Sequence, residues 1–231
     1  MSKSLLKKII ILVSILALPG FLYYLLQEKG QNRYRPLPVF GPKKLSGTFH
    51  SKRGKQIPDT LYHTINSFNL VNQKGDTVNF PGDTPRITVV NFFYSKCGAP
   101  CIKQGNEFRR VVERFKDNRL MSFLSISVDP HETPASLSQY ADNLNTSTEK
   151  WNFVAGDSEE VYKIAKEGFL VDAFADTTGA NNFIYSPLFV LVDPQRRIRG
   201  FYDSSSKEQV DKLMDEVKVL IAEELRKVAD R

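Results

Sequence analysis

The stretch Arg86–Cys101, RITVVNFFYSKCGAPC, carries the strongest structural signal in this chain. Its first ten residues are rich in β-branched and aromatic side chains, which is typical of a strand buried at the centre of a sheet. The strand leads directly to two cysteines, Cys97 and Cys101. Apolar residues then recur at helical spacing over residues 108–115, so the sequence predicts a helix that begins at the cysteine pair.

Beyond this helix, strand-like and helix-like segments alternate, which is the pattern of an α/β fold with a largely parallel sheet. We predict a buried strand at 121–129, a helix over 136–145, a strand at 151–157, a helix over 158–169 capped by Ser158, a strand pair over 188–203 and a final helix over 207–228. This order of elements predicts a thioredoxin-like α/β domain, which we place over residues 59–231.

A hydrophobic segment lies near the N-terminus, where residues 9–26, IIILVSILALPGFLYYLL, contain no charge. At 1.5 Å per residue they form about 27 Å of helix, nearly the thickness of a bilayer core. No clear small-x-small pattern follows, so we predict an uncleaved transmembrane anchor, with cleavage near residues 17–20 as the alternative. Residues 1–8 then form a cytoplasmic stub, and the basic, proline-containing residues 27–58 form a linker.

Charge is distributed unevenly along the chain. Residues 1–55 hold 11 Lys and Arg against the single acidic Glu28, whereas residues 56–231 hold 21 against 25 Asp and Glu. The domain therefore lacks the basic stripe of a nucleic-acid-binding protein, and we expect the three arginines within 196–199 on a solvated strand face. A short stub before a long C-terminal domain fits a single-pass protein of the bacterial inner membrane whose domain faces the periplasm.

The chain has only two cysteines, which excludes a scaffold held together by several disulfides. Residues four positions apart lie on the same side of a helix, so the sulfurs of Cys97 and Cys101 can approach each other. Pro100 fits the first position of the helix, whose dipole stabilises a thiolate. Two kinds of chemistry follow: a reversible disulfide, or a pair of soft thiolates that bind Cu(I).

Five segments of the chain together resemble a known family. They are HTINSFNLVNQKGDTV (63–78), NFFYSKCGAPC (91–101), SVDPHETP (127–134), WNFVAGDSEEVYKIAKEGFLV (151–171) and FVLVDPQRRIRGFYD (189–203). In this order behind a membrane anchor, they are similar to the SCO/SenC family of cytochrome oxidase assembly proteins over about residues 60–220. The resemblance implies a C-x-x-x-C motif at Cys97 and Cys101. It also implies delivery of copper to the dinuclear copper site of cytochrome c oxidase, or reduction of the cysteines of that site.

The chain departs from the family pattern at the third copper ligand. The family has a histidine shortly before the hairpin strand, and counting back from Pro194 places this position at Tyr185. A phenol with a pKa of about 10 is a poor ligand for Cu(I), so the sequence does not predict the family's three-ligand copper site. His131 is the candidate substitute ligand or proton carrier, because it follows a strand whose end shares an edge of the sheet with Cys97; the simpler interpretation is a surface-loop histidine.

A second departure is Ser186-Pro187, which precedes the strand LFVLVD. Thioredoxin-like reductases place a cis-proline at this point, facing their cysteines, and X-Pro bonds are the ones that readily adopt the cis form. Pro187 is therefore a candidate residue of the catalytic site. The alternative is an ordinary trans proline at the start of a strand, with Tyr185 packed over the sulfurs.

These residues leave three functions open. The first is a membrane-anchored thiol-disulfide reductase that acts through Cys97 and Cys101 and needs no cofactor. Its partner would be a cytochrome c oxidase subunit or another extracytoplasmic thiol protein. The alternatives are a Cu(I) metallochaperone that uses both cysteines with a substitute third ligand, and a non-enzymatic redox or copper sensor.

Overall fold

The computed structural model describes residues 3–29, 36–52, 54–96, 98–145, 148–176 and 183–229. The chain divides into two compact units, Met1–Arg35 and Pro36–Arg231. The first unit contains helix α1 (Lys3–Lys29), which includes Pro19. Among the described residues, no helix combines the length and the apolar character needed to cross a membrane. The transmembrane anchor predicted for residues 9–26 is therefore not confirmed.

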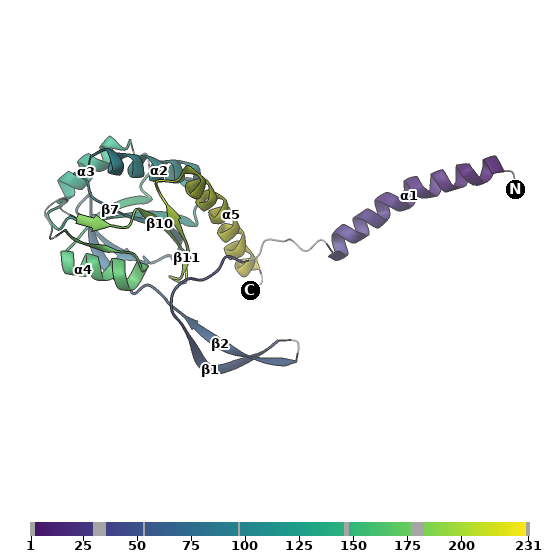
Figure 1. Ribbon diagram of the computed structural model, residues 1–231, viewed down its shortest axis with the longest axis horizontal. Helices are drawn as coiled ribbons and strands as arrows, with labels where there is room; N and C mark the ends of the chain where they lie inside the picture. Colours follow the sequence, from purple (N-terminus) through teal and green to yellow (C-terminus); the bar gives the residue numbers. More distant parts are fainter. Residues whose placement is uncertain are drawn as a thin grey trace. The chain divides into compact units, whose positions relative to one another are not determined.

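The second unit begins with an antiparallel hairpin of β1 (Lys43–Lys52) and β2 (Lys55–Tyr62) (Figure 1). Most of this hairpin lies within residues 27–58, which the sequence predicts as a linker. Its large side chains stay in solvent, with Leu45 72% and Phe49 61% exposed. The two strands are held by their own pairing rather than by burial of one face, so they leave no alternating pattern in the sequence.

A seven-stranded sheet forms the centre of the second unit, in the order β11-β10-β5-β6-β7-β3-β4. Its strands are β3 (Phe68–Asn72), β4 (Thr77–Phe80), β5 (Ile87–Phe93), β6 (Met121–Ser127), β7 (Trp151–Ala155), β10 (Leu188–Val192) and β11 (Ile198–Asp203). Strands β5, β6 and β7 pair in parallel, and the other pairs in this sheet are antiparallel. The predicted α/β class is thus confirmed, with a parallel centre and antiparallel edges.

Helices cover both faces of this sheet (Figure 1). One face carries α2 (Ala99–Phe115), α3 (Pro134–Asn143) and α5 (Lys207–Ala229), and the other carries α4 (Ser158–Lys163) with its π-helical continuation η1 (Ile164–Phe169). Neighbouring residues of β5 point into different cores: Val89 shares one with Phe108 of α2, and Val90 shares the other with Phe169 of η1. Burial on both faces explains why β5 shows no alternation.

Two helix starts differ from the prediction. The N-cap of α4 is Asp157 rather than Ser158, and its carboxylate accepts hydrogen bonds from two backbone N–H groups of the first turn. A carboxylate also interacts favourably with the positive end of the helix dipole. In α2 the N-cap is Gly98, so Pro100 is the second helical residue rather than the first. Gly98 has a φ of 77°, which glycine adopts without strain at the sharp turn from β5 into the helix.

Gly200 of β11 lies against the ring of Tyr202, which is 1% exposed. A Cβ atom at position 200 would lie 2.2 Å from Oη and 2.5 Å from Cζ of that ring. The Tyr202 hydroxyl donates a hydrogen bond to Glu216 of α5, so the ring moves only by losing this bond. We expect Gly200→Ala to lower the free energy of unfolding by about 1 to 3 kcal/mol, the usual effect of overpacking, in chemical denaturation.

The matched control for this substitution is Gly168→Ala in η1. A Cβ atom at Gly168 meets nothing closer than 3.4 Å, which is ordinary van der Waals contact. We therefore expect no loss of stability at Gly168. Equal losses at the two positions would contradict the explanation from overpacking.

Candidate functional site

The first turn of α2 contains Cys101, directly after the buried strand β5 and its sharp turn. The Cys101 side chain is 4% exposed, and it is disulfide-bonded. Cys97, the only other cysteine of the chain, lies outside the described residues. The geometry of the predicted cysteine site is therefore given by the surroundings of Cys101.

A short hairpin brings Tyr185 to Cys101. It consists of β8 (Ala173–Ala175) and β9 (Phe183–Tyr185), which the sequence did not predict because three-residue strands carry no periodic signal. The phenol oxygen Oη of Tyr185 lies 2.8 Å from Sγ of Cys101. Because a sulfur in a disulfide carries no hydrogen, the phenol is the donor in this contact.

Gln104, one helical turn after Cys101, provides a second acceptor for the same phenol. Its amide nitrogen donates a 3.2 Å hydrogen bond to the carbonyl of Phe92, which leaves Oε1 to accept from Oη of Tyr185 at 3.3 Å. Gln104 is 5% exposed. Gln104 was not predicted as a site residue, although a polar side chain three residues after Cys101, on the apolar stripe of α2, was the available signal.

Burial keeps the Tyr185 phenol protonated. It raises the pKa of Tyr185 to about 12, against the opposing effect of a hydrogen bond from the backbone of Tyr94. At neutral pH the side chain is therefore an uncharged donor beside the sulfur. The expectation that Tyr185 packs over the sulfurs is refined by the geometry, because the residue contacts Cys101 through its hydroxyl rather than only through its ring.

A surface pocket of about 630 Å³ adjoins these residues, and Cys101, Tyr185 and Pro187 are part of its wall. Among the residues that the structure describes, the only cis peptide bond is Phe80–Pro81, so Pro187 follows a trans bond. Pro187 therefore does not have the cis-proline geometry considered from the sequence. Its carbonyl instead accepts hydrogen bonds from the backbone N–H and the hydroxyl of Ser204, as expected for a proline at the start of a strand.

His131 is exposed on the loop after β6. This loop is joined to the residues just before Cys97 by an ion pair of 3.1 Å between Lys96 and Asp129. A hydrogen bond from Ser95 to Glu132 makes a second connection. The loop that contains His131 therefore lies beside Ser95 and Lys96, at the sheet edge predicted from the parallel strands. The His131 side chain itself is exposed to solvent.

The side chains of Tyr185 and Gln104 present oxygen atoms at the Cys101 site. Within the described part of the chain, which excludes Cys97, no three His, Cys, Asp or Glu side chains form a group that could hold a metal ion. The phenol oxygen of Tyr185 contacts Sγ of Cys101. The amide oxygen of Gln104 contacts this phenol. Cu(I) prefers thiolate, thioether and imidazole ligands to such oxygens.

A sheet with a parallel centre and helices on both faces, with a disulfide-bonded cysteine where the central strand leads into a helix, defines a thioredoxin-like protein. Residues 58–222 match the model of the SCO1/SenC family. The chain therefore belongs to the SCO1/SenC family, as the sequence predicted.

Three known proteins illustrate this similarity. The chain is 25% identical over 168 residues to a SCO1 protein homolog of Bacillus subtilis (strain 168), covering 71% of this chain and 86% of that protein. The structure of BsSco, a Sco family cytochrome c oxidase assembly protein with a disulfide switch, matches with a TM-score of 0.60 and 22% identity over 68% of this chain and 93% of BsSco. Arabidopsis thaliana ScoI, solved with copper bound, matches with a TM-score of 0.57 and 21% identity over 69% and 99%. At these identities the structural matches show a shared fold.

Proposed function

We propose that this protein is a thiol-disulfide reductase that assists assembly of the copper site of cytochrome c oxidase through Cys97 and Cys101. The observation that carries the proposal is the contact between the Tyr185 phenol and the disulfide-bonded Cys101. A neutral hydrogen-bond donor occupies a position beside the sulfur where a third copper ligand would have to lie. The disulfide switch identified in BsSco supports a redox role for the pair.

The burial of Cys101 supports different roles for the two cysteines. A partner disulfide does not reach a sulfur that is 4% exposed, so the thiolate of Cys97 attacks the partner sulfur. The partner S–S bond breaks and its second sulfur leaves as a thiolate. The Cys101 thiolate then attacks Cys97 in the mixed disulfide, which forms the Cys97–Cys101 bond and releases the other partner thiolate. Two electrons and two protons pass from this chain to its partner.

The proposal includes the location of the protein. The uncharged residues 9–26 would anchor it in the bacterial inner membrane, with the domain in the periplasm. In an oxidising compartment of this kind, protein cysteines form disulfides. The cysteines of a copper site must be reduced there before they bind copper, which is the task proposed for this protein.

Copper delivery is the second candidate, because ScoI of Arabidopsis thaliana was solved with copper bound. In that function the two thiolates of the reduced pair would hold Cu(I) as cargo. His131, on the loop joined to Lys96, would supply the third ligand.

The test uses the reduced full-length protein in detergent and the oxidised copper-site domain of a cytochrome c oxidase subunit. We expect the wild-type protein to reduce the partner disulfide, Cys97→Ser to be inactive, and Cys101→Ser to remain as a mixed disulfide because its resolving thiol is lost. Alkylation followed by mass spectrometry identifies each species. A protein that leaves the partner oxidised, yet takes one Cu(I) from a competing chelator, would replace this proposal with copper delivery.

A further inference from the structure

We propose that Tyr185 is a positioning residue that donates a hydrogen bond to the Cys101 thiolate, and so sets the redox potential of the cysteine pair and the rate of resolution. This inference rests on the proposed thiol exchange. The phenol is suited to the role by position, since its oxygen lies 2.8 Å from Sγ. It is also suited by charge, since a neutral side chain adds no second anion beside the thiolate.

The phenol has one proton and two acceptors within reach. Sγ of Cys101 lies 2.8 Å and Oε1 of Gln104 3.3 Å from Oη. The bond from Gln104 to the Phe92 carbonyl holds Oε1 in place as the alternative acceptor. When Cys101 is a neutral thiol, it can donate to Oη while the phenol donates to Gln104. When Cys101 is a thiolate, the phenol donates its hydrogen bond to the sulfur. Sγ of Cys101 therefore has a hydrogen-bond partner in both protonation states.

A buried thiolate requires such a donor. Cys101 is 4% exposed, and burial by itself disfavours the charged form of a thiol. The N-terminus of the 17-residue helix α2 offsets part of this effect through its dipole. A hydrogen bond to an ionised acceptor is about twice as strong as one between neutral groups, so the phenol adds a further contribution that appears only after ionisation.

The consequence for the pair is twofold. Stabilisation of the thiolate favours the reduced form over the disulfide and makes the pair more oxidising. It also increases the fraction of Cys101 that is ionised at neutral pH and available to resolve the mixed disulfide. Tyr185 therefore makes the protein a weaker reductant of its partner. It also speeds resolution of the mixed disulfide, which releases the protein from the partner.

Tyr185→Phe tests this role, since it keeps the ring and removes only the hydroxyl. We expect the pKa of the Cys101 thiol to rise by about one unit. At a pH above this pKa, where Cys101 of the reduced pair is a thiolate, the equilibrium should shift about tenfold toward the disulfide, equivalent to a potential about 30 mV lower. At a pH below the wild-type pKa, resolution should slow about threefold, because the tenfold loss of thiolate is partly offset by the greater nucleophilicity of a more basic sulfur.

The measurement uses the full-length reduced protein in detergent with a chromogenic aromatic disulfide. Release of the first chromophore reports the attack by Cys97, and release of the second reports resolution by Cys101. The pH midpoint of the second phase gives the pKa of Cys101 in the mixed disulfide. Equilibration with a dithiothreitol redox buffer gives the potential.

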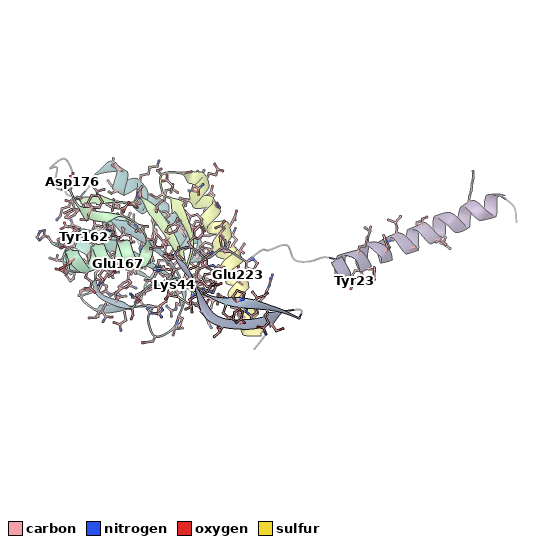
Figure 2. All side chains as sticks on the ribbon, turned by 60° about the horizontal axis from the view of Figure 1, so that its bottom comes forward. Tyr23, Lys44, Tyr162, Glu167, Asp176 and Glu223 are labelled. Atoms are coloured by element: carbon pink, nitrogen blue, oxygen red, sulfur yellow. The ribbon has the colours of Figure 1, made fainter. Side chains whose placement is uncertain are left out.

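Two further variants separate a hydrogen-bond role from a packing role. Tyr162 on α4 (Figure 2) donates a hydrogen bond from its hydroxyl to the carbonyl of Val128 at 3.3 Å. Tyr162→Phe also removes one hydroxyl, and it should leave both phases of chromophore release unchanged. Gln104→Leu removes the competing acceptor, so the phenol proton is left for the sulfur. We expect this change to lower the pH midpoint of the second phase, opposite in sign to Tyr185→Phe.

The outcomes distinguish the two proposals. A wild-type protein that releases only the first chromophore has no resolving thiol, which overturns the proposed function and this inference with it. Two releases in the wild type, with the same midpoint and potential in Tyr185→Phe, would overturn the inference alone. A midpoint that rises in Gln104→Leu as it does in Tyr185→Phe would also overturn it, because general disturbance of the site would then explain both.

Discussion

Arg199→Met is expected to lower the free energy of unfolding by about 3 to 5 kcal/mol, the usual effect of breaking a buried ion pair from one side. The Arg199 side chain is 3% exposed and lies between two carboxylates, 3.2 Å from Asp193 and 2.7 Å from Glu223. Asp193 is fully buried. Removal of the guanidinium leaves both carboxylates with less compensation, and Asp193 has no access to water.

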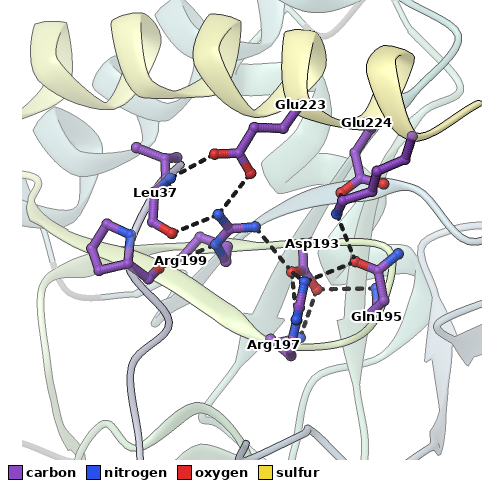
Figure 3. Close-up of polar contacts among 9 residues, drawn as sticks. Leu37, Asp193, Gln195, Arg197, Arg199, Glu223 and Glu224 are labelled. Atoms are coloured by element: carbon purple, nitrogen blue, oxygen red, sulfur yellow. Dashed lines mark hydrogen bonds and ion pairs between the residues drawn. The ribbon is translucent and has the colours of Figure 1, made fainter. Parts of the chain in front are cut away.

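The same guanidinium joins three distant parts of the chain (Figure 3). From β11 it donates to the backbone carbonyls of Leu37 and Pro38 at 2.6 and 3.1 Å, and to Glu223 of α5. Glu223 in turn accepts a 2.6 Å hydrogen bond from the backbone N–H of Leu37. The loss of Arg199 thus also releases the start of the second unit from the final helix.

Thermal or chemical denaturation followed by circular dichroism measures the effect, with an expected fall in Tm of about 10 °C. Arg110→Met is the matched control, because Arg110 also forms two ion pairs, with Glu107 and Asp211, but is 36% exposed. Surface ion pairs are worth about 0 to 1 kcal/mol. Equal losses for Arg199 and Arg110 would show that burial is not what makes the Arg199 network important.

Tyr185→His is expected to raise the affinity of the reduced protein for Cu(I) by about 100-fold, because an imidazole suits copper and a neutral phenol does not. The contact of 2.8 Å between Oη and Sγ of Cys101 shows that the side chain at position 185 points toward the sulfur. The imidazole would therefore join the two thiolates in a three-ligand site. An anaerobic titration against a competing Cu(I) chelator measures the affinity.

Two variants complete this titration. Tyr185→Phe removes the hydroxyl without adding a ligand, so its affinity for Cu(I) should match that of the wild type. His131→Ala examines the substitute ligand and should also have no effect if copper delivery is not the function. Tight one-to-one binding by the wild type that falls in His131→Ala would refute the expectation and identify His131 as the third ligand.

Much of the fold could be predicted because its signals are local. The apolar run of β5 and the helical spacing in α2 and α5 each depend on residues within a few turns of one another. The sequence analysis did not predict β3 and β4, although β3 alternates buried and exposed side chains. The other elements that were not predicted lack a local signal. Residues 43–62 form a hairpin without a buried face, and β8 and β9 have three residues each.

The candidate site was predictable only in part. Cys97 and Cys101 were identifiable from their spacing, and Tyr185 from the resemblance to the family. The trans form of Pro187 and the role of Gln104 as an acceptor depend on packing around the pocket, which neither residue signals in its own sequence neighbourhood.

The sequence by itself determined the order of the strands and helices from β5 to α5 except for β8 and β9, the cysteine pair at the start of a helix and the family. Only the tertiary structure decided which side chains meet. Tyr185 contacts a cysteine 84 residues away, and Arg199, expected on a solvated strand face, is buried against a backbone carbonyl 162 residues away. Periodicity reports the face on which a side chain lies. The partner on that face depends on how the sheet edge, the β8–β9 hairpin and the final helix pack together, because such contacts join segments with no local relation in the chain.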